Sequence, residues 1–216
     1  MSPPNTGTRD STPHPTYDFS HLQVVDALSS LQAVRLRNPK LNDRRAFIWG
    51  GSQGGHIAML ATEFAPHTFA LTIDACGIAY PTPEFWEKAG WHGEGAEFEI
   101  RDTRRFVDKV QNKVVLFHGI KDELVNVQES YDLEKALRNA DKEVEAHYYP
   151  NGDHFLRPDS SRMEATIEHA SRDLLTRRIK GENDFSRGGQ TLMRCAGCKY
   201  VIDFSGELPK LREEKE

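Results

Sequence analysis

A single serine lies among four glycines in the segment "AFIWGGSQGGHIAML", where Gly50-Gly51-Ser52-Gln53-Gly54 fits the pattern G-x-S-x-G. The apolar residues before the glycines read as a short buried strand, and the residues after them read as a helix. In that context small residues permit a sharp strand-to-helix turn that exposes the Ser52 hydroxyl as a nucleophile. A glycine-rich turn capped by a serine is the alternative, so possible partners of Ser52 have to decide between the two.

Two such partners follow later strands. Asp122 comes after "KVVLFHG", and His154 comes after "VEAHYYP". A serine hydroxyl needs a base to take its proton, and the base needs a carboxylate to orient it. The chain order Ser, Asp, His is the one that a strand–turn–helix nucleophile site requires. We therefore predict Ser52 as nucleophile, His154 as general base, Asp122 as orienting carboxylate, and the backbone N–H of Gln53 as an oxyanion donor.

Other titratable residues have simpler interpretations. Glu123 is the alternative to Asp122, although the shape of the loop favours Asp122. Packing or anchoring of a loop is expected for His118, which precedes a glycine at a strand end. Core or surface roles are expected for three further histidines, namely His56, His147 and His169.

Strands alternate with helices along the chain, which predicts an α/β fold with a parallel sheet and helices on both faces. The fourth helix should bury a stripe of Met163, Ile167, Ala170 and Leu174. The predicted strands are "RAFIWG", "FALTIDACG", residues 113–119 and residues 144–150. The predicted helices span residues 21–37, "GGHIAMLATEFAP", residues 128–139 and residues 161–179.

The ends and one insertion divide the chain further. Residues 1–16 are rich in Pro, Ser and Thr and are expected to be disordered, leaving a catalytic domain over 17–180 and a tail over 181–216. The stretch 80–105 has no clean period and is interpreted as an insertion over one end of the sheet. Trp86 and Trp91 within it are candidates to line an acyl or aromatic pocket, and packing alone is an equal alternative.

The tail contains "TLMRCAGCKYVIDFS", which alternates like a hairpin of two short strands with a C-x-x-C at its turn. Such a pair resembles a zinc knuckle, which supplies two of the four ligands that a structural site needs. We expect a plain hairpin that packs on the body or on a partner. The alternative is a zinc site that Cys195 and Cys198 share across a dimer or with Cys76. The final "KLREEKE" is predicted to be a solvated charged end.

Composition excludes several function classes. The net charge is −5 and the basic residues form no long run, which disfavours nucleic-acid binding. The start of the chain has no apolar h-region, and no run of 18 apolar residues occurs, so neither a secretory signal nor a membrane span is expected. Three cysteines are too few for a disulfide framework. A cytoplasmic location is the resulting expectation.

Three segments together resemble the catalytic half of α/β-hydrolases of the prolyl-oligopeptidase type: "IWGGSQGGHIAML", "LFHGIKDELV" and "YYPNGDHF". "YDFSHLQVVDALSSL" resembles the helix before the elbow strand in those enzymes, and the similarity extends over about residues 17–179. The resemblance implies the same triad of Ser52, Asp122 and His154. It also implies a peptide or small ester as substrate, with no cofactor and no metal in the site.

The chain departs from that family before the elbow strand. A full α/β-hydrolase has about four earlier strands, and the loop after its third strand donates a second oxyanion N–H. Only 44 residues precede the elbow strand here, so a partial α/β-hydrolase fold is expected, with slow catalysis and an exposed elbow-strand edge that favours homo-oligomers. The competing hypothesis is a degenerate hydrolase that acts as a non-catalytic interaction module.

Overall fold

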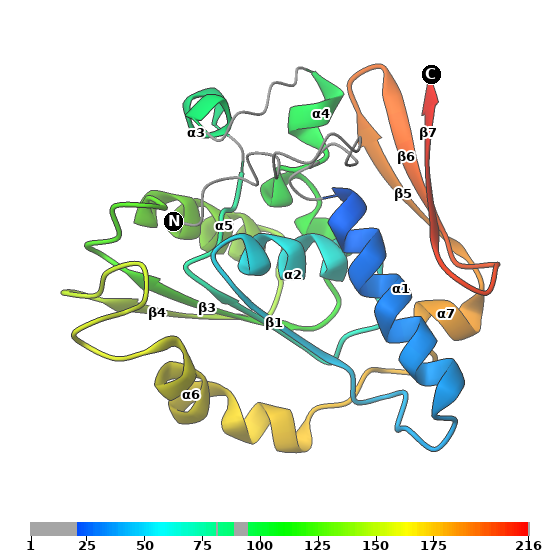
Figure 1. Ribbon diagram of the computed structural model, residues 1–216, viewed down its shortest axis with the longest axis horizontal. Coiled ribbons are helices and arrows are strands. Elements are labelled where there is room, and N and C mark those ends of the chain that lie inside the picture. The colour runs from blue at the N-terminus through cyan, green and yellow to red at the C-terminus, as the bar shows by residue number, and fades with distance from the viewer. Residues whose placement is uncertain (1–20, 81, 89–94, 216) are drawn as a thin grey trace, which may run out of the picture.

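The computed structural model describes residues 21–80, 82–88 and 95–215. Its centre is a four-stranded sheet in the order β1-β2-β3-β4, with every neighbouring pair parallel. The strands are β1 (Phe47–Gly51), β2 (Leu71–Ala75), β3 (Lys113–Gly119) and β4 (Val144–Tyr149). Because all four run the same way, the loops after them meet at one edge of the sheet (Figure 1). The predicted α/β class is confirmed.

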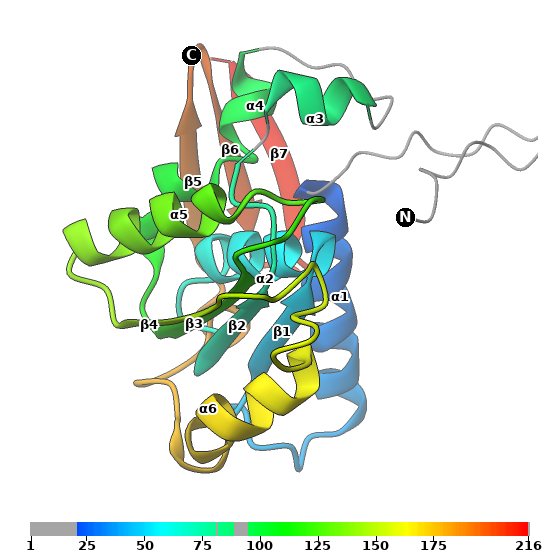
Figure 2. The same cartoon turned by 90° about the vertical axis from the view of Figure 1, so that its left-hand side faces the viewer.

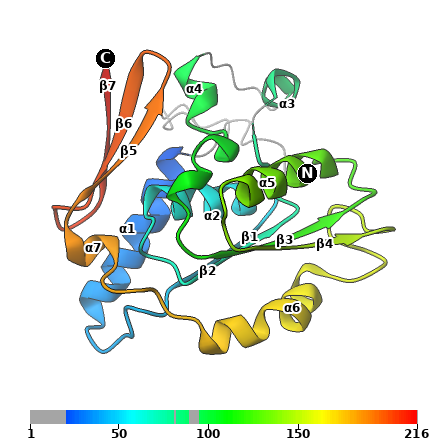
Figure 3. The same ribbon diagram turned by 180° about the vertical axis from the view of Figure 1, so that it is seen from behind.

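Helices cover both faces of this sheet. α2 (Gln53–Phe64) and α5 (Val127–Asn139) lie on one face, and α6 (Arg162–Thr176) lies on the other (Figures 1 and 3). α1 (His21–Arg37) packs against α2 and has the predicted bounds. In the part of the chain that the structure describes, no helix is long and apolar enough to cross a membrane.

The buried stripe predicted for α6 is wrong at two positions. Met163 and Ile167 are each 61% exposed, whereas Ala170 is buried and Leu174 packs against the core under the sheet. The face of α6 that meets the sheet carries the predicted Ala170 together with Ala165, which the prediction left out. Small side chains let the helix lie close to the strands, so the large apolar residues one step around the helix point outward.

The insertion between β2 and β3 forms short helices instead of strands. They are α3 (Pro83–Lys88), α4 (Ala96–Glu99) and two 3₁₀ turns, η1 (Thr103–Arg105) and η2 (Val107–Lys109). Trp91 and the side chain of Trp86 lie outside the described residues, as does the segment 1–16.

The tail folds into a second, antiparallel sheet that packs on the body. After α7 (Asp184–Arg187) come β5 (Gln190–Cys195), β6 (Cys198–Asp203) and β7 (Lys210–Lys215), which stand beside α1 and α4 (Figure 2). The inner face of this sheet shares one apolar cluster with α1 and α2, in which Ile202 and Phe204 join Leu28 and Phe64. Folding of the tail is therefore tied to folding of the body.

The charged segment "KLREEKE" is solvated over its described residues, as predicted, but it also forms a strand that was not predicted. Lys210–Lys215 pair with β6 along their whole length, and most of their side chains remain exposed. Lys and Glu are depleted in strands in general, but charged residues are common on edge strands, where they discourage further pairing.

Truncating Ile202 should test whether the second sheet and the body unfold together. Ile202 is fully buried in the shared cluster, so Ile202→Ala should lower the free energy of unfolding by about 2–5 kcal/mol in a single urea transition. Leu192→Ala, on the exposed side of β5, is the matched control and should have a much smaller effect. A separate early transition confined to the variant's tail would contradict a shared core.

Candidate active site

The turn between β1 and α2 carries Ser52 in a strained conformation. Its φ is 58° and its ψ is −128°, a region that non-glycine residues rarely occupy. The Ser52 N–H donates to the Ala75 carbonyl oxygen at the end of β2 (3.0 Å), which fixes the turn to the sheet. Such a turn is what the G-x-S-x-G pattern predicted.

Close packing of α2 onto β1 explains some of the glycines but not all of them. A Cβ at Gly50 would lie 1.9 Å from the Gly54 carbonyl oxygen, so only glycine fits there. Gly54 is not required for space, because a Cβ there meets nothing within 4 Å. Gly55 takes that role, since a Cβ at Gly55 would lie 2.0 Å from Oδ1 of Asp74.

Asp122 and His154 meet beyond the ends of β3 and β4. Nδ1 of His154 lies 2.7 Å from Oδ2 of Asp122, and the other carboxylate oxygen accepts the backbone N–H groups of Leu124 (2.8 Å) and Val125 (2.9 Å). Because an ionised carboxylate only accepts, Nδ1 of His154 carries the proton. Its Nε2 is then left as the basic atom. Glu123, the alternative orienter, is exposed.

His118 anchors the loop after β3, as one of its two predicted roles, and it is also a direct partner of Asp122, which was not predicted. Its Nε2 lies 3.2 Å from Oδ2 of Asp122 and 3.1 Å from the Val125 carbonyl oxygen, while Nδ1 lies 2.6 Å from the Ser130 hydroxyl. A carbonyl oxygen can only accept, so Nε2 donates and the Ser130 hydroxyl donates to Nδ1. The signal in the sequence was the position of His118 at the strand end, four residues before Asp122.

The charge on Asp122 is strongly stabilised. Burial alone would raise the pKa of this carboxyl, but hydrogen bonds from His118, His154 and the amides of Val125 and Leu124 together hold the pKa well below its ordinary value. Asp122 is therefore an anion at neutral pH, and it keeps the proton of His154 on Nδ1.

Arg162, at the start of α6, connects the loop of His154 with the turn of Ser52. Nη2 of Arg162 donates to the His154 carbonyl oxygen (2.5 Å), and a Cβ at Gly51 would lie 2.6 Å from Nη1 of the same guanidinium. The guanidinium also stands over the ring of Phe155, 5.1 Å from its centroid. Arg162 is thus a second site residue that the sequence interpretation missed.

All three predicted triad members therefore lie at the carboxyl edge of the sheet, and two of them are hydrogen-bonded. The Ser52 hydroxyl makes no hydrogen bond within the described ranges 21–80, 82–88 and 95–215. Catalytic hydrogen bonds are often long in unliganded sites and shorten when substrate binds. Gln53 begins α2, where backbone N–H groups point out of the helix, and its side chain donates to Oε1 of Gln23 (3.0 Å).

His56, His147 and His169 have core or partly buried positions, as expected. His56 is fully buried, donates from Nδ1 to the Ile78 carbonyl oxygen (2.8 Å), and has its pKa lowered to about 4 by burial. His147 and His169 are half-buried on the face of the sheet that α6 covers.

Cys195 and Cys198 face each other across the β5–β6 hairpin as buried cysteines that form no disulfide. Burial raises the pKa of Cys195 to about 12, so its thiol stays protonated. Sharing of a metal with Cys76 was a wrong alternative, because Cys76 lies beside His118 and Asp122. Of the residues that the structure describes, no third His, Cys, Asp or Glu joins the hairpin pair.

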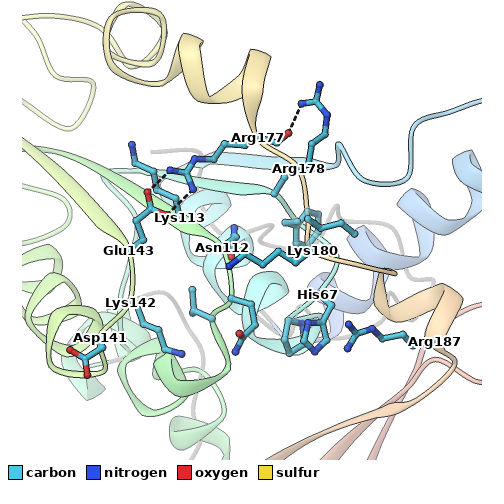
Figure 4. A pocket seen from close by; sticks show the side chains of 16 residues that line it. His67, Asn112, Lys113, Asp141, Lys142, Glu143, Arg177, Arg178, Lys180 and Arg187 are labelled. Atoms are coloured by element: carbon cyan, nitrogen blue, oxygen red, sulfur yellow. Dashed lines mark hydrogen bonds and ion pairs between the residues drawn. The ribbon is translucent and has the colours of Figure 1, made fainter.

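A basic cavity occupies the opposite edge of the sheet. It measures about 540 Å³ and lies against the start of β3, with Lys113, Lys142, Lys180 and Arg187 among the residues around it (Figure 4). Arg177, at its rim, is paired with Glu143. The residues at this edge do not include Ser52, Asp122 or His154, so the cavity is separate from the candidate active site.

The parallel sheet with helices on both faces, together with the strained serine turn, defines a partial α/β-hydrolase fold. The structure of an acylaminoacyl peptidase from Pyrococcus horikoshii superposes with a TM-score of 0.62 at 18% identity, covering 73% of this chain and 28% of that one. A truncated carbohydrate esterase from gut microbiota gives 0.56 at 14% identity, covering 71% and 67%.

The sequence comparison names the family. The model of the prolyl oligopeptidase family matches residues 20–172, and the chain belongs to that family. An uncharacterized peptidase, YtmA, of Bacillus subtilis is 27% identical over 157 residues, which is 67% of this chain and 61% of the relative. The human prolyl endopeptidase FAP is 26% identical over 153 residues, covering 64% and 20%. The chain thus spans only part of these relatives, about three fifths of the first and one fifth of the second.

Replacing the buried Asp74 should flatten the pH dependence of stability. Burial raises the pKa of Asp74 from 3.8 to about 7, so the folded state holds a proton there that the unfolded chain releases near pH 4. The contribution of Asp74 to the free energy of unfolding is therefore fully present below about pH 4 and is lost as the pH rises through 7. Asp74→Asn should remove that loss, making the decrease in unfolding free energy from pH 5 to pH 8 smaller by about 1 kcal/mol or more.

The control for this prediction is Asp108→Asn, because the Asp108 side chain is exposed. Urea unfolding at pH 5 and pH 8 measures all three proteins. Identical slopes in wild type and Asp74→Asn would show that Asp74 is ionised in the folded protein at both pH values.

Proposed function

We propose that the chain is a serine hydrolase that cleaves a carboxylic ester or peptide bond through an acyl-enzyme. The observation that carries the proposal is the 2.7 Å hydrogen bond between Asp122 and His154 at the same sheet edge as the strained Ser52 turn. Two comparisons support a hydrolase. The chain belongs to the prolyl oligopeptidase family, and a relative is named a peptidase.

In the proposed reaction Nε2 of His154 takes the proton of the Ser52 hydroxyl as Oγ attacks the substrate carbonyl carbon. The protonated imidazole then gives that proton to the leaving alcohol or amine, and an acyl group remains on Ser52. Water, activated in turn by His154, releases the acid. Asp122 remains an anion throughout, because its hydrogen-bond donors keep its pKa low and thereby stabilise the charged imidazole.

The negative oxygen of the intermediate requires donors. The backbone N–H of Gln53 supplies one, at the beginning of α2 where the helix dipole also favours negative charge. Loss of one oxyanion donor typically reduces turnover about 10²–10³-fold. We therefore propose that the 216-residue chain is a slow catalyst unless a second donor comes from elsewhere.

The substrate class stays open between esters and peptides. Trp86 and Trp91 remain candidates for lining the acyl or aromatic subsite, because α3 belongs to the insertion that the sequence predicted over one end of the sheet. The site chemistry proposed here needs no metal and no organic cofactor. The chain is proposed to act in the cytoplasm.

A fluorophosphonate probe tests the nucleophile. Ser52 should attack the phosphorus and displace fluoride, so wild type should be labelled and Ser52→Ala should not. His154→Gln and Asp122→Asn should slow labelling by about 10²–10⁴-fold. The first variant lacks the general base, and the second lacks the carboxylate that holds the His154 proton on Nδ1. Mass spectrometry after proteolysis locates the adduct, and hydrolysis of p-nitrophenyl acetate measures turnover in the same proteins.

Ser171→Ala is the matched control for this test, because Ser171 is exposed on α6. It should leave both labelling and turnover unchanged. An adduct on another serine, or equal labelling of wild type and Ser52→Ala, would exclude Ser52 as the nucleophile.

Arg162 should matter for rate through the position of His154. Arg162→Gln removes the guanidinium that donates to the His154 carbonyl oxygen and lies against Gly51. We expect labelling of Ser52 to slow roughly 10- to 100-fold, since small displacements of a catalytic group have effects of that size. Arg172→Gln, exposed on the same helix, should have no effect. A slowed Arg162→Gln variant should also show a shifted His154 imidazole NMR signal, whereas simple loss of stability would leave that signal in place.

The competing function is a non-catalytic interaction module. The observation that favours it is the free edge of β1, which is the outer strand of the described sheet and exposes Trp49 to 47%. Met163 and Ile167 add exposed apolar surface on α6, whose Thr166 accepts a hydrogen bond from Trp49. Association at this edge, with a second copy of the chain or with another partner, is compatible with both the hydrolase and the interaction module. Absence of any Ser52-dependent labelling, in a folded protein that associates, would favour the module.

A further inference from the structure

Two imidazoles and a carboxylate gather under the sheet, on the face that α6 covers. Glu145 and His147 project from β4, and His169 projects toward them from α6. One potential ligand atom from each lies within 4.8 Å of the other two. The three are half-buried, at the side of the molecule away from the β1 edge.

We propose that Glu145, His147 and His169 form a binding site for a divalent late transition-metal ion, with Zn²⁺ as the expected occupant. Imidazole nitrogen and carboxylate oxygen are the ligands that suit Zn²⁺, and three protein ligands leave a fourth position for water. The site is independent of Ser52, and nothing in the proposed hydrolysis uses it.

The two imidazole rings lie side by side on an aromatic side chain. Their centroids are 3.7 Å apart and their planes differ by 16°. The Phe117 ring lies 5.6 Å from His147 and 6.0 Å from His169, so the rings pack against an apolar surface. This packing keeps one nitrogen of each ring within 4.8 Å of the other and of a Glu145 oxygen.

The Glu145 carboxylate is ionised and lies close to the His147 imidazole. Oε1 of Glu145 lies 2.7 Å from Nε2 of His147, and Oε2 lies 2.5 Å from Nζ of Lys113. Burial would raise the pKa of Glu145, but Lys113 and His147 hold it below its ordinary value. With an ion on Oε1, Lys113 would stay on Oε2 as an outer partner that orients the ligand.

Charge around the cluster favours a dication. Among the described residues that form ion pairs with the cluster or with its partners, four are Asp or Glu and two are Lys or Arg, so these residues carry an excess of negative charge. These residues are Glu143, Glu145, Glu168 and Asp173, against Lys113 and Arg177. The ion pairs of Lys113 and Arg177 with Asp173 also fix the α6 segment that follows His169.

Binding requires a small rearrangement. Ligand atoms around tetrahedral Zn²⁺ lie about 3.3 Å apart when the metal–nitrogen distance is about 2.0–2.1 Å. Any two of the three ligand atoms that lie farther apart than this must therefore move toward each other. The near-parallel rings must also turn about their Cβ–Cγ bonds for both nitrogens to point at one ion. That torsion is broad for histidine, so the turn is inexpensive.

Calorimetric titration of the full 216-residue chain with Zn²⁺ at pH 7.5 tests the site. One ion per chain should bind, Mg²⁺ should not, and thermal unfolding should shift upward with Zn²⁺. His147→Gln and His169→Gln should each weaken Zn²⁺ binding tenfold or more and abolish the thermal shift. Affinity should fall at acid pH, because protons compete with the ion for the ligand atoms.

Two control variants separate this site from other potential ligands. His67→Gln removes a histidine from the basic cavity, and Cys198→Ser removes a thiol from the hairpin, and neither should change the affinity. The Co²⁺-loaded protein should lack the charge-transfer band that thiolate ligands give. Zn²⁺ binding that survives His169→Gln but is lost in Cys198→Ser would overturn the proposal and assign the metal to the hairpin.

Discussion

The close approach of α2 to the first two strands is the constraint on which the rest of the site depends. A Cβ at Gly50 would strike the Gly54 carbonyl oxygen, and one at Gly55 would strike Asp74, so the helix can lie at this distance only because both positions are glycine. The approach forces a sharp turn between strand and helix, and the turn places Ser52 at a positive φ. A residue in that region costs about 1–3 kcal/mol, which the surrounding contacts must offset. The hydrogen bond from Ser52 N–H to Ala75 is one of these contacts.

The buried acids near this edge differ in charge because they differ in partners. Asp122 receives donors from two histidines and two amides, and these outweigh its burial. Burial instead raises the pKa of Asp74 and of Glu129 to about 7, although the Ala79 N–H donates to Glu129 (2.9 Å). One carboxylate is thus kept as an anion next to His154, while two others are protonated for part of the time near neutral pH. Asp122 therefore supplies a fixed negative charge where the proposed base needs it.

Features that depend on the spacing of apolar residues and on the order of elements along the chain could be predicted from the sequence. Alternation of strands and helices predicted the parallel sheet, and the positions of Asp122 and His154 after strand ends predicted that they would meet. Features that depend on distances across the fold were not predictable in this way. Arg162 contacts the site through Gly51 and the His154 carbonyl oxygen, and no local pattern marks such contacts. Met163 and Ile167 were wrongly placed in the buried stripe of α6, because large apolar residues were assumed to be buried there, whereas alanines face the sheet.

That packing of α6 means that polar contacts hold the helix as much as apolar burial does. Ala165 and Ala170 bury little surface, so the helix gains less from the hydrophobic effect than a stripe of Met and Ile would give. Hydrogen bonds along the helix offset this smaller hydrophobic gain. Arg162 donates to the His154 carbonyl oxygen, Thr166 accepts from the Trp49 indole, and Asp173 accepts from Lys113. These contacts connect α6 to the loop of His154, to the free edge of the sheet and to the carboxylate of Glu145 through Lys113. The placement of one helix therefore sets the geometry of the proposed base and of the proposed metal ligands together.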